Sequence, residues 1–138
     1  MEFESTKIVA VHRSPGFKWA YGSIKGGTTP LVYGNHLLSF FHSTLDNEPP
    51  PYRRRYYIGA VTFENTPPFA VVSVSKEPIL FGSEVDDSSE IERSACSHRK
   101  EKVVFPVGSA WASPDAAWLS YGVNDCQCAI STVKDFKL

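Results

Sequence analysis

The sequence has few features that would tie it to a metal or to an oxidising compartment. Its three cysteines, Cys96, Cys126 and Cys128, are an odd number that provides no disulfide framework. Only one residue separates Cys126 from Cys128, whereas structural zinc knuckles use a spacing of two. We therefore expect no metal site, no organic cofactor, and a reducing compartment such as the cytoplasm.

The chain also lacks a charge of one sign and any long apolar run. Its 14 basic and 15 acidic residues leave a formal net charge of -1, which gives no broad attraction to nucleic acid or to an anionic membrane. No segment approaches the roughly 18 to 20 apolar residues of a membrane-spanning helix. The first residues do not form a basic and apolar signal peptide. The sequence therefore predicts a soluble protein with neither nucleic acid nor membrane as a partner.

Helical periodicity is scarce, whereas the residues typical of short strands are plentiful. Aromatic residues make up 13% of the chain, and its 10 prolines punctuate short apolar runs. The length of 138 residues suits a single domain, 1–138, whose core can form without cross-links. The composition predicts an all-β fold of antiparallel strands.

One stretch, residues 25–44, organises the rest. Two apolar runs, Leu31 to Tyr33 and Leu37 to Phe41, flank Gly34-Asn35, and a glycine in first place supplies the positive φ of a type II′ hairpin turn. Lys25 and a pair of glycines precede this hairpin, and His42 follows it. We expect a β-hairpin with polar groups gathered at one end.

The remaining segments extend this plan. The pattern predicts a strand at 7–12 that adds to a sheet, further strands at 56–63, 70–75 and 77–81, and a polar surface loop at 82–102. A second unit, 103–138, begins with an apolar run at 103–106. It contains a turn at 113–115 and strands at 118–121 and 128–133, with Gly122-Val-Asn-Asp between these two strands.

The second unit weakly repeats the first, 13–81. Aligning Gly27 with Gly108, an offset of 81 residues, also aligns Leu38 with Leu119, Ser39 with Ser120 and Phe40 with Tyr121. This order of elements predicts about two antiparallel propeller-type blades, that is, a partial β-propeller. A compact β-sandwich is the alternative.

Several short motifs occur in an order that resembles a known family. They are Lys25-Gly-Gly-Thr-Thr-Pro-Leu, Phe40-Phe-His-Ser, Tyr56-Tyr-Ile-Gly-Ala-Val, Glu77-Pro-Ile-Leu, Val103-Val-Phe-Pro-Val-Gly and Tyr121-Gly-Val-Asn-Asp. Together they resemble the C-terminal portion of the five-bladed propellers of glycoside hydrolase family 130, the β-mannoside phosphorylases and hydrolases, and the similar domains found beside bacterial glycosyltransferases.

The resemblance implies site residues in the funnel of a propeller. By resemblance, His42, Asp125 and either Tyr56 or Tyr57 match groups that bind a sugar, and Lys25 lies where the family carries a basic residue. Inorganic phosphate would be bound by Lys25 with Arg53 or Arg55. The alternatives are a hairpin-end histidine for His42, a turn-forming aspartate for Asp125 and a plain surface lysine for Lys25.

The catalytic acid of that family comes from N-terminal blades that have no counterpart in this chain. We therefore assign no catalytic residue and expect a non-catalytic, carbohydrate-binding fragment whose partner is a carbohydrate or sugar phosphate. One alternative is a mannoside hydrolase or phosphorylase completed by oligomerisation, and another is a structural module without a ligand. Two blades leave sheet faces and edges exposed, so we expect a homo-oligomer.

Overall fold

The computed structural model describes residues 25–46, 54–81, 103–125 and 127–138. The predicted strand at 7–12, the predicted surface loop at 82–102 and the predicted phosphate ligand Arg53 lie outside the described residues. The rest of the chain tests the expected order of strands and the placement of the other site residues.

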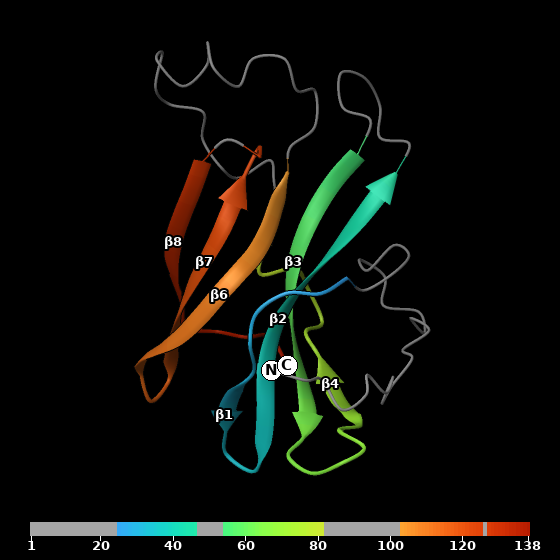
Figure 1. Cartoon of the computed structure of the whole chain (residues 1–138), viewed down its shortest axis with the longest axis vertical. Helices are drawn as coiled ribbons and strands as arrows, with labels where there is room; N and C mark the ends of the chain where they lie inside the picture. The colour runs from blue at the N-terminus through green and yellow to red at the C-terminus, as the bar shows by residue number, and fades with distance from the viewer. Residues whose placement is uncertain (1–24, 47–53, 82–102, 126) are drawn as a thin grey trace, which may run out of the picture.

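The described part of the chain is all-β, as predicted, and consists of two antiparallel sheets (Figure 1). Sheet A has the order β1-β2-β3-β4, with β5 also paired to β3, and sheet B has the order β6-β7-β8. The strands are β1 (Leu31–Tyr33), β2 (His36–Asp46), β3 (Arg54–Glu64), β4 (Val71–Val74), β5 (Leu80–Phe81), β6 (Val104–Ser113), β7 (Ala116–Val123) and β8 (Gln127–Val133). Across these ranges the structure contains no helix that could cross a bilayer.

The predicted hairpin around Gly34 is confirmed. Tyr33 pairs with His36 across a two-residue turn, and Gly34 has φ of 57°, which a glycine adopts without a steric penalty. The strand predicted at 118–121 is longer than expected, because β7 begins at Ala116 and continues through Gly122 and Val123. Gly122 pairs with Phe105 of β6 and with Cys128 of β8, and a Cβ at this position would lie 2.4 Å from Cζ of the Phe105 ring. Asn124 and Asp125, the described residues of the connection between β7 and β8, both have positive φ.

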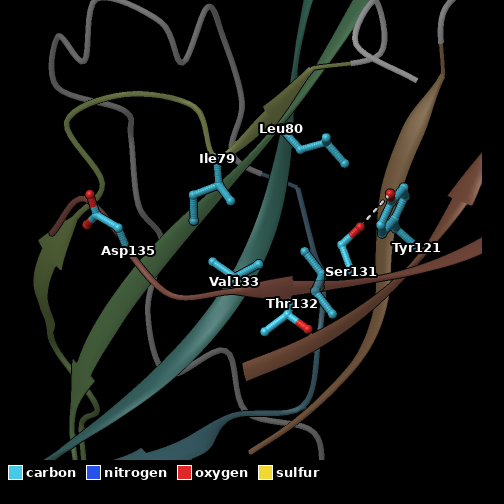
Figure 2. A pocket seen from close by; sticks show the side chains of 8 residues that line it. Ile79, Leu80, Tyr121, Ser131, Thr132, Val133 and Asp135 are labelled. Carbon is cyan, nitrogen blue, oxygen red and sulfur yellow. Dashed lines mark hydrogen bonds between the residues drawn. The ribbon is translucent and has the colours of Figure 1, made fainter. Parts of the chain in front are cut away.

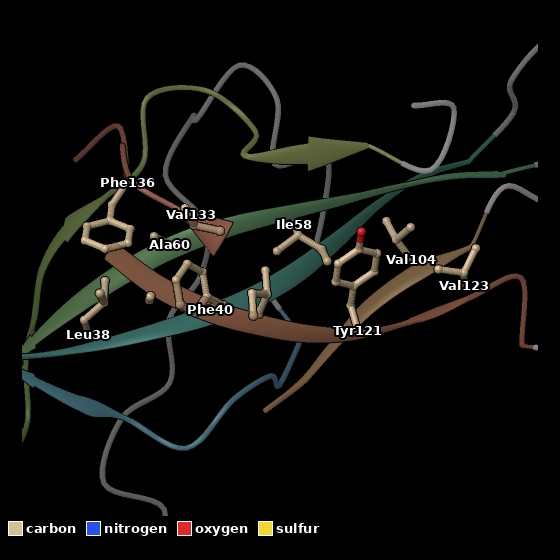
Figure 3. Packing of buried hydrophobic residues seen from close by; sticks show 11 residues of the cluster. Leu38, Phe40, Ile58, Ala60, Val104, Tyr121, Val123, Val133 and Phe136 are labelled. Atoms are coloured by element: carbon tan, nitrogen blue, oxygen red, sulfur yellow. The ribbon is translucent and has the colours of Figure 1, made fainter. Parts of the chain in front are cut away.

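A single apolar core lies between the two sheets (Figure 3). Sheet A contributes residues that alternate along β2 and β3, and sheet B contributes the facing residues of β6, β7 and β8. The fully or nearly fully buried members are Leu38, Phe40, Ile58, Ala60, Val104, Ala117, Leu119, Tyr121, Val123, Val133 and Phe136. This packing of one sheet on another is compatible with both a partial propeller and a sandwich.

The two sheets differ in what covers their other faces. Sheet A has a second apolar cluster on its opposite side, formed by Phe41, Tyr57, Val61 and Val74. Sheet B instead leaves Trp118 54% and Ile130 73% exposed. The central strands of sheet A, β2 and β3, are therefore buried on both faces, whereas sheet B has an outer face with large exposed apolar side chains.

The segment after β8 ties the sheets together. Phe136 enters the core and makes edge contacts with the rings of Tyr33, Phe40 and Trp111. The Lys76 amide donates to the Lys137 carbonyl at 2.7 Å. The end of the chain thus joins sheet A to sheet B through backbone and ring contacts.

Candidate functional site

The segment that precedes the first hairpin lies against β2 and is fastened to it by hydrogen bonds. Lys25 and His42 form an isolated antiparallel bridge, with the Lys25 amide 2.9 Å from the His42 carbonyl. Thr28 is buried, and its amide donates to the Phe40 carbonyl while its Oγ1 accepts from the Phe40 amide. Ser39 Oγ donates to the Thr28 carbonyl at 2.7 Å. Lys25 and Gly26 are therefore held beside His42.

Only a glycine fits at position 27 in this arrangement. A Cβ there would lie 1.7 Å from the Phe40 carbonyl oxygen and 2.9 Å from the Phe41 Cα, both of them backbone atoms. A Cβ at Gly26 would meet nothing within 4 Å. The close approach of the two backbones thus depends on Gly27, the second glycine of the pair.

His42 is half-buried and oriented by the backbone of this segment. Its Nδ1 lies 2.9 Å from the Gly26 carbonyl oxygen, which only accepts, so Nδ1 carries the proton. Burial lowers the pKa of His42 below its ordinary value of 6.5, and the nearby Lys25 charge also lowers it, against the raising effect of the Gly26 hydrogen bond. The neutral imidazole that results offers Nε2 as a hydrogen-bond acceptor.

The ring of Tyr56 stacks beside this histidine. The two ring centroids are 6.3 Å apart, with an angle of 20° between their planes. Because side chains alternate along a strand, His42 lies on the same face of sheet A as Leu38 and Phe40. Tyr56 lies on the same face as Ile58 and packs against the core cluster. The two rings thus lie on the face of sheet A that packs against sheet B, at the point along β2 and β3 where apolar side chains are followed by polar ones.

The structure separates Tyr56 from Tyr57, which the sequence left as alternatives. Tyr57 is buried in the second cluster, where its ring meets Phe81 at 6.0 Å. Arg55 shares the face of Tyr57 by the same alternation, and both residues lie on the side of sheet A away from His42. Of the predicted sugar and phosphate ligands, the structure brings together Lys25, His42 and Tyr56.

Asp125 lies on sheet B, in the turn between β7 and β8. This turn and the adjoining ends of β2 and β3 occupy the same end of the molecule (Figure 1). Asp125 is exposed and lines an open hollow of about 390 Å³ with Phe105, Val107, Gly122, Gln127 and Cys128. Neither His42 nor Tyr56 lines that hollow, so Asp125 is at the same end but in a separate surface feature.

A further pocket, of about 210 Å³, lies where β5 approaches sheet B (Figure 2). Its walls combine aliphatic side chains with the Tyr121 and Ser131 hydroxyls, which are 2.9 Å apart, and with Asp135. The sequence did not point to a pocket here, because this pocket exists only once two distant segments have packed together. The Gly26 carbonyl that orients His42 was missed as well, although the glycine pair beside Lys25 was a signal for it.

Along the described ranges no group of three His, Cys, Asp or Glu side chains is placed to hold a metal ion. Cys128 is an exposed free thiol on β8. A scan against protein-family models finds none that matches this chain, and a search of curated proteins finds no match either.

Proposed function

We propose that this chain binds a carbohydrate without cleaving it, on the surface formed by Lys25, His42 and Tyr56. The observation that carries the proposal is the hydrogen bond from His42 Nδ1 to the Gly26 carbonyl, beside the stacked ring of Tyr56. A neutral histidine with a fixed tautomer accepts a hydrogen bond from a sugar hydroxyl through Nε2. The resemblance to mannoside-processing propellers points to a mannoside as the ligand.

The aromatic rings supply the second element of sugar recognition. A pyranose has one face of C–H groups, and aromatic faces cover such apolar surfaces. Tyr56 is partly buried and packed against the core, so its ring is held in place before a ligand arrives. Lys25 is exposed beside His42 and adds a compact positive charge, which suits a sugar phosphate.

The proposal includes no catalysis, because glycoside hydrolysis canonically requires two carboxyl groups placed on either side of the scissile bond. Several described carboxylates lie away from this surface. Glu64 is at the far end of the β2–β3 pair opposite His36, and Glu77 pairs with Lys137. Asp115 is in the β6–β7 turn, and Asp135 lines the pocket of Figure 2. Asp125 lines a hollow on sheet B.

Calorimetric titration with methyl β-mannoside, mannose 1-phosphate and inorganic phosphate tests the proposal. The wild-type chain should bind the sugar, and Tyr56→Ala and His42→Val should each abolish binding. Tyr57→Phe is the matched control, because it keeps the ring against Phe81 on the opposite face. At a hundredfold excess of ligand over the Kd, the apparent stability should rise by about 2.7 kcal/mol.

Three outcomes would contradict the proposal. One is no binding of any of the three ligands, which would favour a structural module. Another is binding that survives Tyr56→Ala and His42→Val but fails in Tyr57→Phe. The third is release of a product from a mannoside, which would show turnover.

A further inference from the structure

The free edge of sheet B differs from the other edges that the structure describes. β8 has seven residues, and its register with β7 is regular from end to end. The outer strands of sheet A are short, with three residues in β1, four in β4 and two in β5. β6, the other outer strand of sheet B, has two register shifts and contains Pro106.

Natural sheets protect their edges with short strands, bulges, prolines or charged side chains. β8 has none of these devices, since its sequence, Gln-Cys-Ala-Ile-Ser-Thr-Val, contains neither a charge nor a proline. The far edge of β8 has no partner strand within the described ranges, and Figure 1 shows β8 at the outer side of its sheet. Its outer-face side chains, Cys128, Ile130 and Thr132, are all exposed.

We propose that β8 pairs with β8 of a second copy of this chain, antiparallel and about a two-fold axis through Ile130. In such an isologous pair, with the axis perpendicular to the sheet, one residue must face its own copy. Placing the axis at Ile130 is the arrangement that pairs all seven residues of the strand, from Gln127 with Val133 of the copy to Val133 with Gln127 of the copy.

The chemistry of β8 suits its own copy as the occupant. A strand with a central lysine or glutamate would repel itself across the axis, whereas β8 is uncharged throughout. Ile130, the most exposed large apolar side chain among the described residues, would meet its symmetry mate on the outer face. The inward-facing neighbours Ala129 and Ser131 are small and leave room for the approach. Two three-stranded sheets would become one six-stranded sheet.

Sedimentation velocity of the full chain tests the proposal. The wild type should be a dimer at high-micromolar concentration, and Ile130→Lys should be a monomer, because it places two like charges opposite each other. Val32→Lys is the control, since Val32 is 65% exposed on β1 and its replacement should leave the dimer intact. Near-UV circular dichroism checks that both variants remain folded.

Disulfide trapping fixes the register of the pair. With the three native cysteines replaced by serine, Ile130→Cys should form an intermolecular disulfide, because directly opposed residues have Cα atoms about 4.5 to 5.5 Å apart. Thr132→Cys should not, since Thr132 would lie about 13 Å along the strand from its own copy.

A wild-type monomer at high-micromolar concentration would overturn the proposal. So would a dimer that dissociates in Val32→Lys but not in Ile130→Lys, or one that is trapped at position 132 and not at 130. A monomer whose β8 amides are all protected from hydrogen exchange would show that another segment of the same chain covers the edge, which also overturns it.

Discussion

The hairpin of β1 and β2 and the hairpin of β6 and β7 share a plan as far as their aromatic positions, Phe40 and Tyr121. Leu38 and Leu119 are both fully buried, and Phe40 and Tyr121 lie in the same core. Ser39 and Ser120 each donate a hydrogen bond to a backbone carbonyl of the preceding segment, that of Thr28 or of Gly108. Two residues beyond the aromatic, the first hairpin has His42 and the second has Val123.

The difference between His42 and Val123 separates a candidate site from a core position. Val123 is 1% exposed and belongs to the apolar cluster, whereas His42 is half-buried and bonded to the Gly26 carbonyl. The first hairpin also has a segment that crosses close to β2 at Gly27, while β6 continues as a strand past Gly108. The polar candidate site thus lies where the first hairpin has His42 in place of the apolar Val123 of the second hairpin.

The largest effects should come from the two leucines that the hairpins contribute to the shared core. Leu38→Ala and Leu119→Ala should each lower the free energy of unfolding by about 2 to 5 kcal/mol, because each leaves a cavity in the same cluster. Denaturant unfolding, with the exposed Val32→Ala as control, measures this effect. Separate unfolding transitions for the two sheets would contradict a shared core, since one core requires one transition.

The close approach of two backbones at Gly27 distinguishes the two hairpins, and a substitution there should cause the next largest loss of stability. Gly27→Ala should cost about 1 to 3 kcal/mol, because its Cβ would overlap the Phe40 carbonyl and force the backbone to shift. Gly108→Ala should cost less, since its Cβ would be 3.1 Å from a side-chain hydroxyl, that of Ser120. Gly26→Ala, with open space around it, is the control. Equal melting temperatures for all three variants would contradict the arrangement.

The stability of the protein should depend on pH through His42, whereas Val123, the equivalent residue of the second hairpin, has no ionisable group. Since the fold lowers the pKa of His42, the unfolded chain binds more protons than the folded chain below the ordinary pKa of 6.5. The contribution of His42 to stability is therefore complete above that pH and declines as the pH falls toward its folded value. His42→Val should remove this part of the decline.

Thermal unfolding of wild type and His42→Val between about pH 8 and about pH 5 measures the difference. His36→Asn is the matched control on the same strand, and it should keep the decline because it retains His42. An unchanged decline in His42→Val would show that His42 is not the group responsible.

The smallest effects concern three serine hydroxyls. Ser39→Ala should cost about 1 kcal/mol through its buried 2.7 Å hydrogen bond, and Ser120→Ala should cost less because its 3.2 Å bond is only partly buried. Ser43 Oγ is buried without a hydrogen-bond partner in the described part of the chain, so Ser43→Ala should be neutral or stabilising. Chemical denaturation measures the free energy of unfolding of the three variants. A larger loss in Ser43→Ala than in Ser39→Ala would contradict the hydrogen-bond assignments.

The sequence was sufficient to predict the elements whose local chemistry decides their shape. Gly34 in the first turn position predicted the hairpin, and the apolar runs predicted β3, β4 and β8 within a few residues. The ends of the strands were harder to predict. β2 continues through polar residues to Asp46, because β3 pairs with it as far as Arg54. The end of β7 was predicted at Tyr121, because the sequence pattern does not reveal that Gly122 pairs within the sheet under the ring of Phe105.

The candidate site could be predicted only in part. The spacing of Lys25, the glycine pair and His42 indicated polar groups at one end of the hairpin, and the structure places them together. The choice between Tyr56 and Tyr57 depends on the register of β3 against β2, because a shift of one residue exchanges the faces. The position of Asp125 depends on how the two sheets pack, which no local pattern encodes.

Nuclear magnetic resonance of the His42 imidazole nitrogens, without and with methyl β-mannoside, tests whether a neutral His42 binds the sugar through Nε2. We expect a neutral Nδ1–H tautomer at neutral pH, a pKa of His42 below the ordinary 6.5, and a shift of the Nε2 resonance when the sugar is added. An Nε2–H tautomer, or an Nε2 resonance that does not respond to saturating sugar, would contradict it.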